Sequence, residues 1–324
     1  MTRGPGLGLA PSTGMHTTDS LKPSQRSESA PPASRALPWL CLLVAVAAAA
    51  AASTGLLLDG GEGPRAFTTV QGQVALIHGR GLYRHDSAFS GAAFRGQDLV
   101  TLALAVPLLL LATWRSRSGS LRWAAIQLGV IAYFSYVYAS MALGAAYNQL
   151  FLLYVVLLSA SSFALAAGMR AAAARAGAFL GAPRLAPAIY LLAAGTVTVA
   201  VWLPPLVTAV LSGGTPPLLD HYTTSFTYAL DLAIIAPATF VSAFAILRRR
   251  AAGYVLAFPL LGLIVLLGPV IVAGTIFQLR AGLAFSAAEV AGPIAGFLSL
   301  GVAAIWILAA ILRRLPSASS AWVR

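Results

Sequence analysis

The stretch from residue 226 to residue 247 reads FTYALDLAIIAPATFVSAFAIL and contains one charged side chain, Asp231. It is long enough to cross the ~30 Å hydrocarbon core of a bilayer, which takes ~20 helical residues. The whole chain has the same character: 59% of its 324 residues are hydrophobic, 9% are charged and the mean hydropathy is +0.83. A water-soluble domain carries far more charge. The composition therefore predicts an all-α, polytopic membrane protein.

Apolar runs of this length recur and predict a transmembrane helical bundle of about eight spans. We place the spans near residues 36–58, 97–114, 123–144, 147–168, 187–211, 226–247, 252–277 and 287–312. The first run also has an Ala-rich end that suits signal cleavage, but its length favours an uncleaved span. The remaining predicted parts are a disordered tail at 1–35, rich in Ser, Pro and Gly, a long outer loop at 59–96 and a short tail at 315–324, with 36–314 as the membrane domain.

Charged residues divide between the two sides of this topology. Sixteen of the 21 basic residues lie in the first tail, in the loops after the even-numbered spans or after the last span. By the positive-inside rule that side is cytoplasmic and holds both termini. The net charge of +12 is explained by this topology, and no basic cluster interleaved with aromatic residues predicts a nucleic-acid partner. Beyond the first tail, the acids fall in outer loops or at the outer ends of spans: Asp59, Glu62, Asp86, Asp98, Asp220, Asp231 and Glu289.

Three of these acids are predicted to lie within spans. An ionisable side chain inside a span is rare, and the first hypothesis is that it belongs to a functional site. Asp231 is about five residues, or roughly 8 Å, inside its span. Asp98 begins its span and could act only as a helix N-cap, and Glu289 lies in a first turn, where the helix dipole favours an acid. For Asp231 the competing interpretation is a structural partner such as a Tyr, a Thr or Arg280.

The outer loops add His85, Asp86, Asp220 and His221 to the candidate polar or ion site. Histidines and carboxylates are metal ligands, but no H-x-x-x-H or comparable spacing is present, so ordinary loop histidines are favoured and a metal stays undecided. No lysine lies in a span to bind a cofactor covalently, and the single cysteine rules out cysteine-based metal or redox motifs. We predict no cofactor and assign no catalytic residue.

Two segments suggest an internal repeat. RHDSAFSGAAFRGQDLVTLALAVP, from residue 84 to 107, and DHYTTSFTYALDLAIIAP, from 220 to 237, each join a His and an Asp to a later Asp-Leu and a proline. A 4+4 parallel repeat would relate the halves by an axis along the membrane normal. Asp98 and Asp231 would then be equivalent and would flank a central cavity. The proline follows its Asp by nine residues in one segment and six in the other, so chance similarity is the alternative.

Several stretches resemble a group of bacterial multi-pass integral membrane proteins. They are GLYRHDSAFSGAAFRGQDLVTLALAVPLLL, YVYASMALGAAYNQLFLLYV, YTTSFTYALDLAIIAPA and GTIFQLRAGLAFSAAEVAGPIAGF. The resemblance covers most of the chain from about residue 60 onward. It implies a place in the bacterial inner membrane and brings no activity and no site residues with it.

Three functions compete, and we rank them in this order. Acids within spans that are interrupted by proline favour a carrier-like protein for a small solute or cation, with the lipid bilayer and that solute as partners. A structural or sensory membrane subunit, in which the acids only join helices, is second. A membrane enzyme that acts at the outer face on a lipid-linked substrate is third.

Overall fold

The structure is a computed structural model that describes residue 1 and residues 32–216 and 219–315. Within its helices the side chains of residues 32–34, 288, 289 and 293 are not described. The two predicted tails, 1–35 and 315–324, therefore lie almost entirely outside the described residues.

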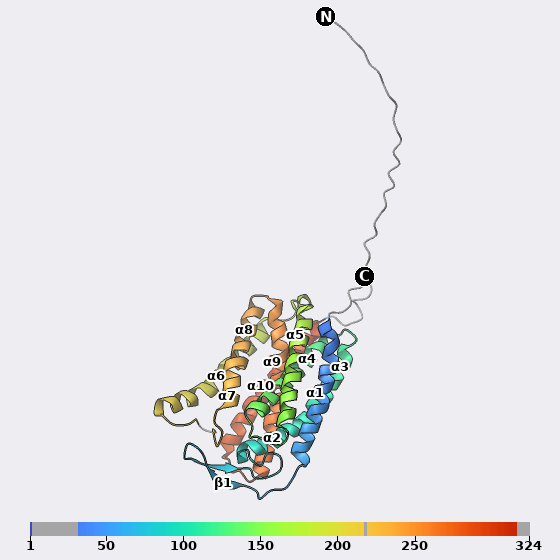
Figure 1. Ribbon diagram of the computed structural model, residues 1–324. Helices are drawn as coiled ribbons and strands as arrows, with labels where there is room; N and C mark the ends of the chain where they lie inside the picture. The colour runs from blue at the N-terminus through green and yellow to red at the C-terminus, as the bar shows by residue number, and fades with distance from the viewer. Residues whose placement is uncertain (2–31, 217–218, 316–324) are drawn as a thin grey trace. The chain divides into compact units, whose positions relative to one another are not determined.

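In the described part of the chain, eight helical runs are long and apolar enough to span a membrane, which confirms the predicted all-α bundle (Figure 1). The chain is a multi-pass membrane protein. In order, the spans are α1 (Pro32–Leu57), α2–η1–α3 (Ala88–Val100, Thr101–Ala105 and Val106–Ser116), α4 (Leu121–Leu143), α5 (Phe151–Ala173), α6 (Leu185–Ser212), α7–η3–α8 (Phe226–Leu230, Asp231–Ile235 and Ala236–Leu247), α9 (Ala251–Arg280) and α10 (Ala287–Arg314). A short 3₁₀-helix, η2 (Ala176–Phe179), lies between α5 and α6.

The second span begins nine residues earlier than predicted, so the outer loop is shorter. The Ser87 hydroxyl accepts the Ser90 N–H at 3.1 Å and caps α2. The prediction missed this start because small and polar residues, Arg95 among them, lower the hydropathy of the first turns. Asp98 is consequently not an N-cap, and lies ten residues, or about 15 Å, along the helix from Ala88.

The outer loop also contains the only two strands in the described part of the chain. β1 (Arg65–Thr68) and β2 (Val74–Ile77) pair antiparallel, with Arg65 opposite Ile77. This hairpin lies beside α2 at one end of the bundle (Figure 1).

The four spans of each half pack in the same order. In the first half α1 contacts α2 and α3, α3 contacts α4, and α4 contacts α5; in the second half α6 contacts α8, α8 contacts α9, and α9 contacts α10. The third spans, α4 and α9, pack on each other, and a Cβ on either Gly129 or Gly262 would meet the other helix's backbone. The helix backbones of the two halves thus touch at this crossing.

The second span of each half contains a π-helix at a matching place. In η1 the N–H of Val106 bonds to the carbonyl of Thr101, and in η3 the N–H of Ala236 bonds to the carbonyl of Asp231. Each π-helix ends two residues before a proline, which has no N–H to continue the hydrogen-bond ladder. The match therefore pairs Asp231 with Thr101, and the predicted equivalence of Asp231 and Asp98 is wrong.

The last part of α6 leaves the bundle. Pro204 and Pro205 lie inside this helix, where each removes a backbone hydrogen bond and bends the axis. Beyond them the helix points away from its neighbours, and Val210 and Leu211 are exposed (Figure 1).

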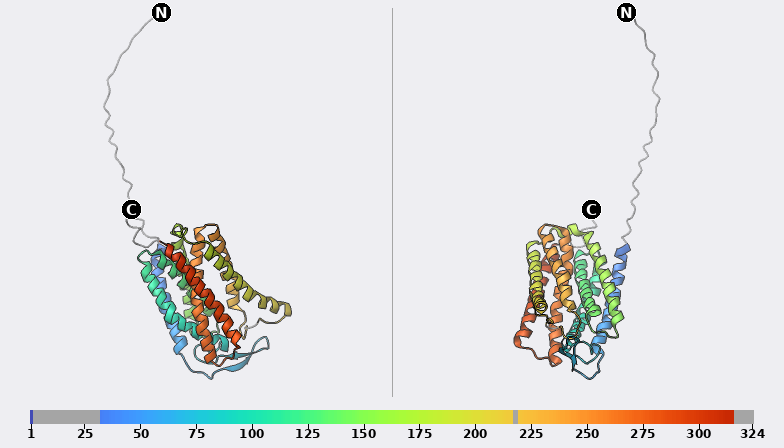
Figure 2. Two further views of the ribbon diagram at one scale, coloured as in Figure 1. Left: turned by 180° about the vertical axis from the view of Figure 1, so that it is seen from behind. Right: turned by 60° about the vertical axis from the view of Figure 1, so that its left-hand side comes forward.

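The loops form two chemically different ends of the bundle, seen from two sides in Figure 2. The basic end holds the loops that follow α3, α5 and α8, with Arg117, Arg175 and the run 248–250. It is tied together by Arg175, which donates to the Gly119 carbonyl at 3.1 Å, and by Arg122, which donates to the Leu315 carbonyl at 2.9 Å. The acidic end holds the hairpin and the loops that precede α5 and α7.

Candidate functional site

Three carboxylates are held inside the bundle at its acidic end without a basic partner. Asp86 and Asp98 are 1% and 5% exposed, and Asp231 is half-buried. Over the described residues the one ion pair joins the exposed side chains of Arg65 and Glu62. None of the three acids forms an ion pair among the described residues, although the charge of Arg95 acts on Asp98 from a greater distance.

Asp86 connects three outer segments. Its Oδ1 accepts the N–H of Ala146, in the α4–α5 hairpin, and the hydroxyl of Tyr222, in the loop before α7, both at 2.8 Å. Its Oδ2 is buried without a hydrogen-bond partner. Burial raises the pKa of Asp86 to about 6, although both hydrogen bonds favour the ionised form and oppose that shift.

Asp98 is enclosed by aromatic residues. Its Oδ2 accepts the Tyr83 hydroxyl at 2.6 Å, and the Tyr83 ring packs on Phe94 with 5.4 Å between ring centroids. Gly55 of α1 lies directly against this pair, since a Cβ there would overlap both Asp98 and the Tyr83 hydroxyl. The charge of Asp98 also acts electrostatically on the buried hydroxyl of Tyr154. A glycine is thus required where α1 passes the carboxylate.

Asp231 joins three helices at the first residue of η3. Its Oδ1 accepts the Tyr136 hydroxyl of α4 at 3.0 Å, and its Oδ2 accepts the Trp202 indole N–H of α6 at 2.9 Å. The indole stacks on Tyr228 at 4.3 Å between centroids. The predicted structural partners thus include the right residue type, a tyrosine, but Arg280 is not among the hydrogen-bond partners of Asp231.

The equivalent residue of the other π-helix is bound in the same way. The Thr101 hydroxyl, at the start of η1, lies 2.8 Å from the Tyr133 hydroxyl of α4. Tyr133 and Tyr136 are three residues apart, so they lie on neighbouring positions of one helical face. One face of α4 therefore holds the start of both π-helices through phenol hydroxyls.

A cavity of about 120 Å³ lies between the start of α2, the end of α4 and α7. We call it the hydroxyl cavity, because its lining includes Ser90, Ser140, Tyr222, Thr224, Ser225, Thr227 and Tyr228. Tyr222 binds Asp86 directly, whereas Tyr228 stacks on the tryptophan that binds Asp231, and Phe94 packs on the tyrosine that binds Asp98. No acid lines the cavity itself among the described residues; one residue separates it from Asp86, and two residues separate it from Asp231 and from Asp98.

The predicted loop residues lie next to this site but do not form a cluster with it. His221 packs on Tyr222 with 4.3 Å between ring centroids, and burial lowers the pKa of His221, while the charge of Asp220 opposes that shift. Asp220 has a left-handed φ of 51° and one buried oxygen without a hydrogen-bond partner. His85 is exposed beside the buried Asp86.

Glu289 belongs to the first turn of α10, as predicted, but its side chain lies outside the described residues. In the part of the chain with described side chains, no three His, Cys, Asp or Glu side chains are placed to hold a metal ion. Asp86, Asp98 and Asp231 are each bound singly by neutral donors.

The partners of the carboxylates were not predicted individually. Tyr222 and Tyr83 are in the loops that supplied candidate acids, and Tyr136 is in a tyrosine-rich part of α4. The sequence gives one weak indication that Trp202 binds a polar group, since its indole lies inside an apolar span just before two prolines. A buried indole seeks a hydrogen-bond acceptor, and a carboxylate in a span is the strongest one available.

No known protein family, curated protein or solved structure matches the chain. The resemblance to a bacterial membrane-protein group stays a prediction.

Proposed function

We propose that the protein is a carrier-like protein of the bacterial inner membrane, which binds protons or a small cation at the carboxylates of its acidic end. The observation that supports this proposal is the set of three acids, the buried Asp86 and Asp98 and the half-buried Asp231, that form no ion pair among the described residues.

The physical reason is the cost of an unbalanced charge. Removing a carboxylate from water costs several kcal/mol, and phenol or indole donors offset part of that cost without neutralising the charge. A proton or a cation from solution neutralises it. Acids that remain inside membrane spans in this way are typical of ion and proton pathways.

The hydroxyl cavity lies next to Tyr222, which binds Asp86, and so offers a polar space close to the acids. A volume of about 120 Å³ has room for several water molecules at ~30 Å³ each. Hydroxyl groups both donate and accept hydrogen bonds, so they can solvate an entering cation or pass a proton. The cavity is also too small for a large substrate, which favours a small solute.

The interrupted spans support the same proposal. π-Helices occur frequently at functional sites, and discontinuous helices form the ion sites of many carriers. Here Asp231 is itself the first residue of η3, so its position depends on the π-helical turn. A change from π- to α-helical winding would move this carboxylate relative to Tyr136 and Trp202.

The test is ion flux in proteoliposomes that contain a pH-sensitive dye, with imposed proton, Na⁺ or K⁺ gradients. We expect the wild-type protein to dissipate one of these gradients and Asp231→Asn to lower the rate at least about tenfold, a loss of 1.4 kcal/mol or more. Glu62→Gln is the control, because Glu62 is an exposed acid at the same end. Wild-type protein that moves none of these ions, or equal flux from Asp231→Asn, contradicts the proposal.

A structural or sensory subunit is the second candidate, and one observation favours it. Both oxygens of Asp231 already accept hydrogen bonds from different helices, as expected of a residue that joins them. In that case Asp231→Asn would lower the thermal unfolding temperature, and neither wild type nor variant would carry ions.

A further inference from the structure

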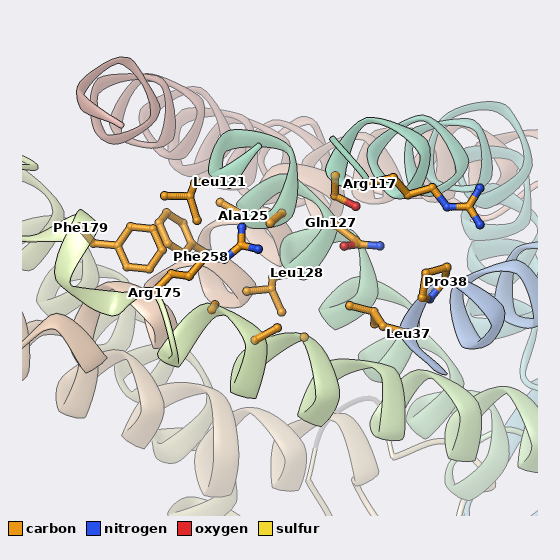
Figure 3. Close-up of a pocket in the computed structure, with 15 residues that line it drawn as sticks. Leu37, Pro38, Arg117, Leu121, Ala125, Gln127, Leu128, Arg175, Phe179 and Phe258 are labelled. Carbon is orange, nitrogen blue, oxygen red and sulfur yellow. The ribbon is translucent and has the colours of Figure 1, made fainter. Parts of the chain in front are cut away.

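Two hollows meet at Arg117, at the basic end and far from the acids. The first has a volume of about 230 Å³ and lies among α1, the end of α3, α4, α5 and Phe258 of α9 (Figure 3). The second, of about 170 Å³, lies between α1 and α3. Pro38 and Arg117 line both, so the two hollows are neighbours.

The first hollow combines a cation with apolar walls. Figure 3 shows the guanidinium of Arg175 turned towards the middle of the hollow, opposite Leu128 and near Phe258. One nitrogen of Arg175 donates to the Gly119 carbonyl, and a guanidinium has further N–H groups for a second acceptor. Gln127 lies in the same wall, but the N–H groups of its amide already donate to Thr113 and to Cys41. The remaining N–H groups of Arg175 suit a polar, negatively charged headgroup.

The second hollow is apolar and faces outward. Its lining includes Trp39 and Trp114, which are 70% and 62% exposed, together with Leu42 and Leu110. Exposed tryptophans near the end of a span are typical of the membrane interface. A groove of this kind, on the lipid-facing side of two spans, fits a hydrocarbon chain.

Arg117 lies where the polar and the apolar hollow join. Figure 3 shows its guanidinium turned away from the first hollow, on the side of Pro38, where the second hollow begins. Among the described residues no Asp or Glu lines either hollow, and Arg115 lies nearby over the Trp114 ring at 5.1 Å. The local charge therefore attracts an anion, and guanidinium groups bind phosphate through paired hydrogen bonds.

We propose that these hollows bind one anionic phospholipid of the leaflet at the basic end. Its phosphate lies at Arg117, its polar headgroup enters the hollow that contains Arg175, and an acyl chain lies along Trp39 and Trp114. By the positive-inside rule this leaflet is the cytoplasmic one. This proposal is independent of the proposed function, because it uses the opposite end of the bundle and none of the acids.

The experiment is native mass spectrometry of the full-length protein in detergent with phosphatidylglycerol or phosphatidylcholine. We expect the wild-type protein to retain phosphatidylglycerol at least about tenfold better, which corresponds to 1.4 kcal/mol or more. The double variant Arg117→Gln, Arg175→Gln should lose this preference. Arg313→Gln, Arg314→Gln should keep it, because it removes two exposed charges of the same end outside the hollows.

Arg117→Gln alone serves as a second variant if the double variant does not fold, since it leaves the bond from Arg175 to Gly119 intact. It should lower the preference for phosphatidylglycerol several-fold. An equal loss of preference in both double variants would mean diffuse attraction to a basic surface, and would overturn the site. Binding of soluble glycerol phosphate as tight as that of phosphatidylglycerol, with no effect of Trp114→Ala, would assign the hollows to a soluble anion instead of a lipid.

Discussion

Asp86 is the acid whose protonation should be visible in the stability of the protein. Its folded pKa of about 6 lies above the ordinary value of 3.8, so the folded protein binds this proton more tightly than the unfolded chain does. The free energy of unfolding must then fall as the pH rises from about 4 to about 6. The ionised form is the less stable one because one of its oxygens is buried without a partner.

Asp86→Asn should remove this pH dependence. The amide oxygen can still accept the Ala146 N–H and the Tyr222 hydroxyl, and no charge is buried at any pH. As the pH rises from 4 to 7, we expect the variant to become more stable than wild type, by up to about 3 kcal/mol in the free energy of unfolding. Its thermal unfolding temperature should then exceed that of wild type by an increasing margin. The check is a series of thermal unfolding curves in detergent across that range. Parallel curves for wild type and variant would show that Asp86 does not titrate there.

Gly55 is the second residue at which a substitution should have a large effect on stability. Gly55→Ala should destabilise the protein by about 1–3 kcal/mol, because the added methyl group overlaps the buried pair of Asp98 and Tyr83. Gly296→Ala is the matched control in another span, with no atom within 4 Å of an added Cβ. There the change should be neutral or stabilising, since alanine favours a helix over glycine by up to about 1 kcal/mol. Thermal unfolding of both variants gives the comparison, and equal effects would contradict the close contact at Gly55.

At the scale of single elements, α6 is joined to other spans by polar contacts of Tyr190, which donates to the Leu300 carbonyl at 2.9 Å, and of Trp202. Trp202 is its link to Asp231, two residues before Pro204, and past the prolines the helix leaves the bundle. Trp202→Phe keeps an aromatic ring to stack on Tyr228 but removes the N–H, so it should cost about 1–3 kcal/mol of stability. Trp306→Phe, at an exposed position of α10, should cost much less. Unfolding curves for the two variants test this, and similar losses would mean that the indole N–H is unimportant.

The spans could be predicted because apolar length is a property of each segment alone. The span from 226 to 247 agrees at both ends, and most others agree within a few residues. The start of α2 could not be predicted in the same way, because Arg95 and small residues precede Asp98 and the helix is held there by its Ser87 cap and by tertiary contacts. The start of α2 is therefore determined by tertiary packing and not by the hydropathy of its own residues.

The site could be predicted only in part, for a related reason. The sequence indicates that Asp231 is within a span, but its partners come from α4 and α6, and no local pattern says which tyrosine or tryptophan will meet it. The π-helices are equally hidden, because their extra residue leaves the apolar character of a span unchanged. In the sequence, only the proline that follows each π-helix indicates where it lies. Aligning the two halves by their acids, Asp98 with Asp231, therefore gave the wrong register between them.

At the scale of the whole molecule, the two halves depend on the crossing of α4 and α9. Gly262→Ala should lower the unfolding temperature, since its methyl group would press on the Gly129 backbone, which cannot move aside as a side chain can. The expected cost is about 1–3 kcal/mol. Gly268→Ala, in the same helix, is the control, because its nearest neighbours would be at ordinary contact distances of 3.6 and 3.9 Å. If both variants unfold alike, the crossing is not a tight one.

The same crossing has an electrical consequence. Where the backbones of Gly129 and Gly262 touch, there is no room for a water molecule between these two helices. A membrane voltage of 100 mV does about 2.3 kcal/mol of work on each charge that crosses. At this crossing, the contact between α4 and α9 closes the space between them to the ions that such a voltage would drive.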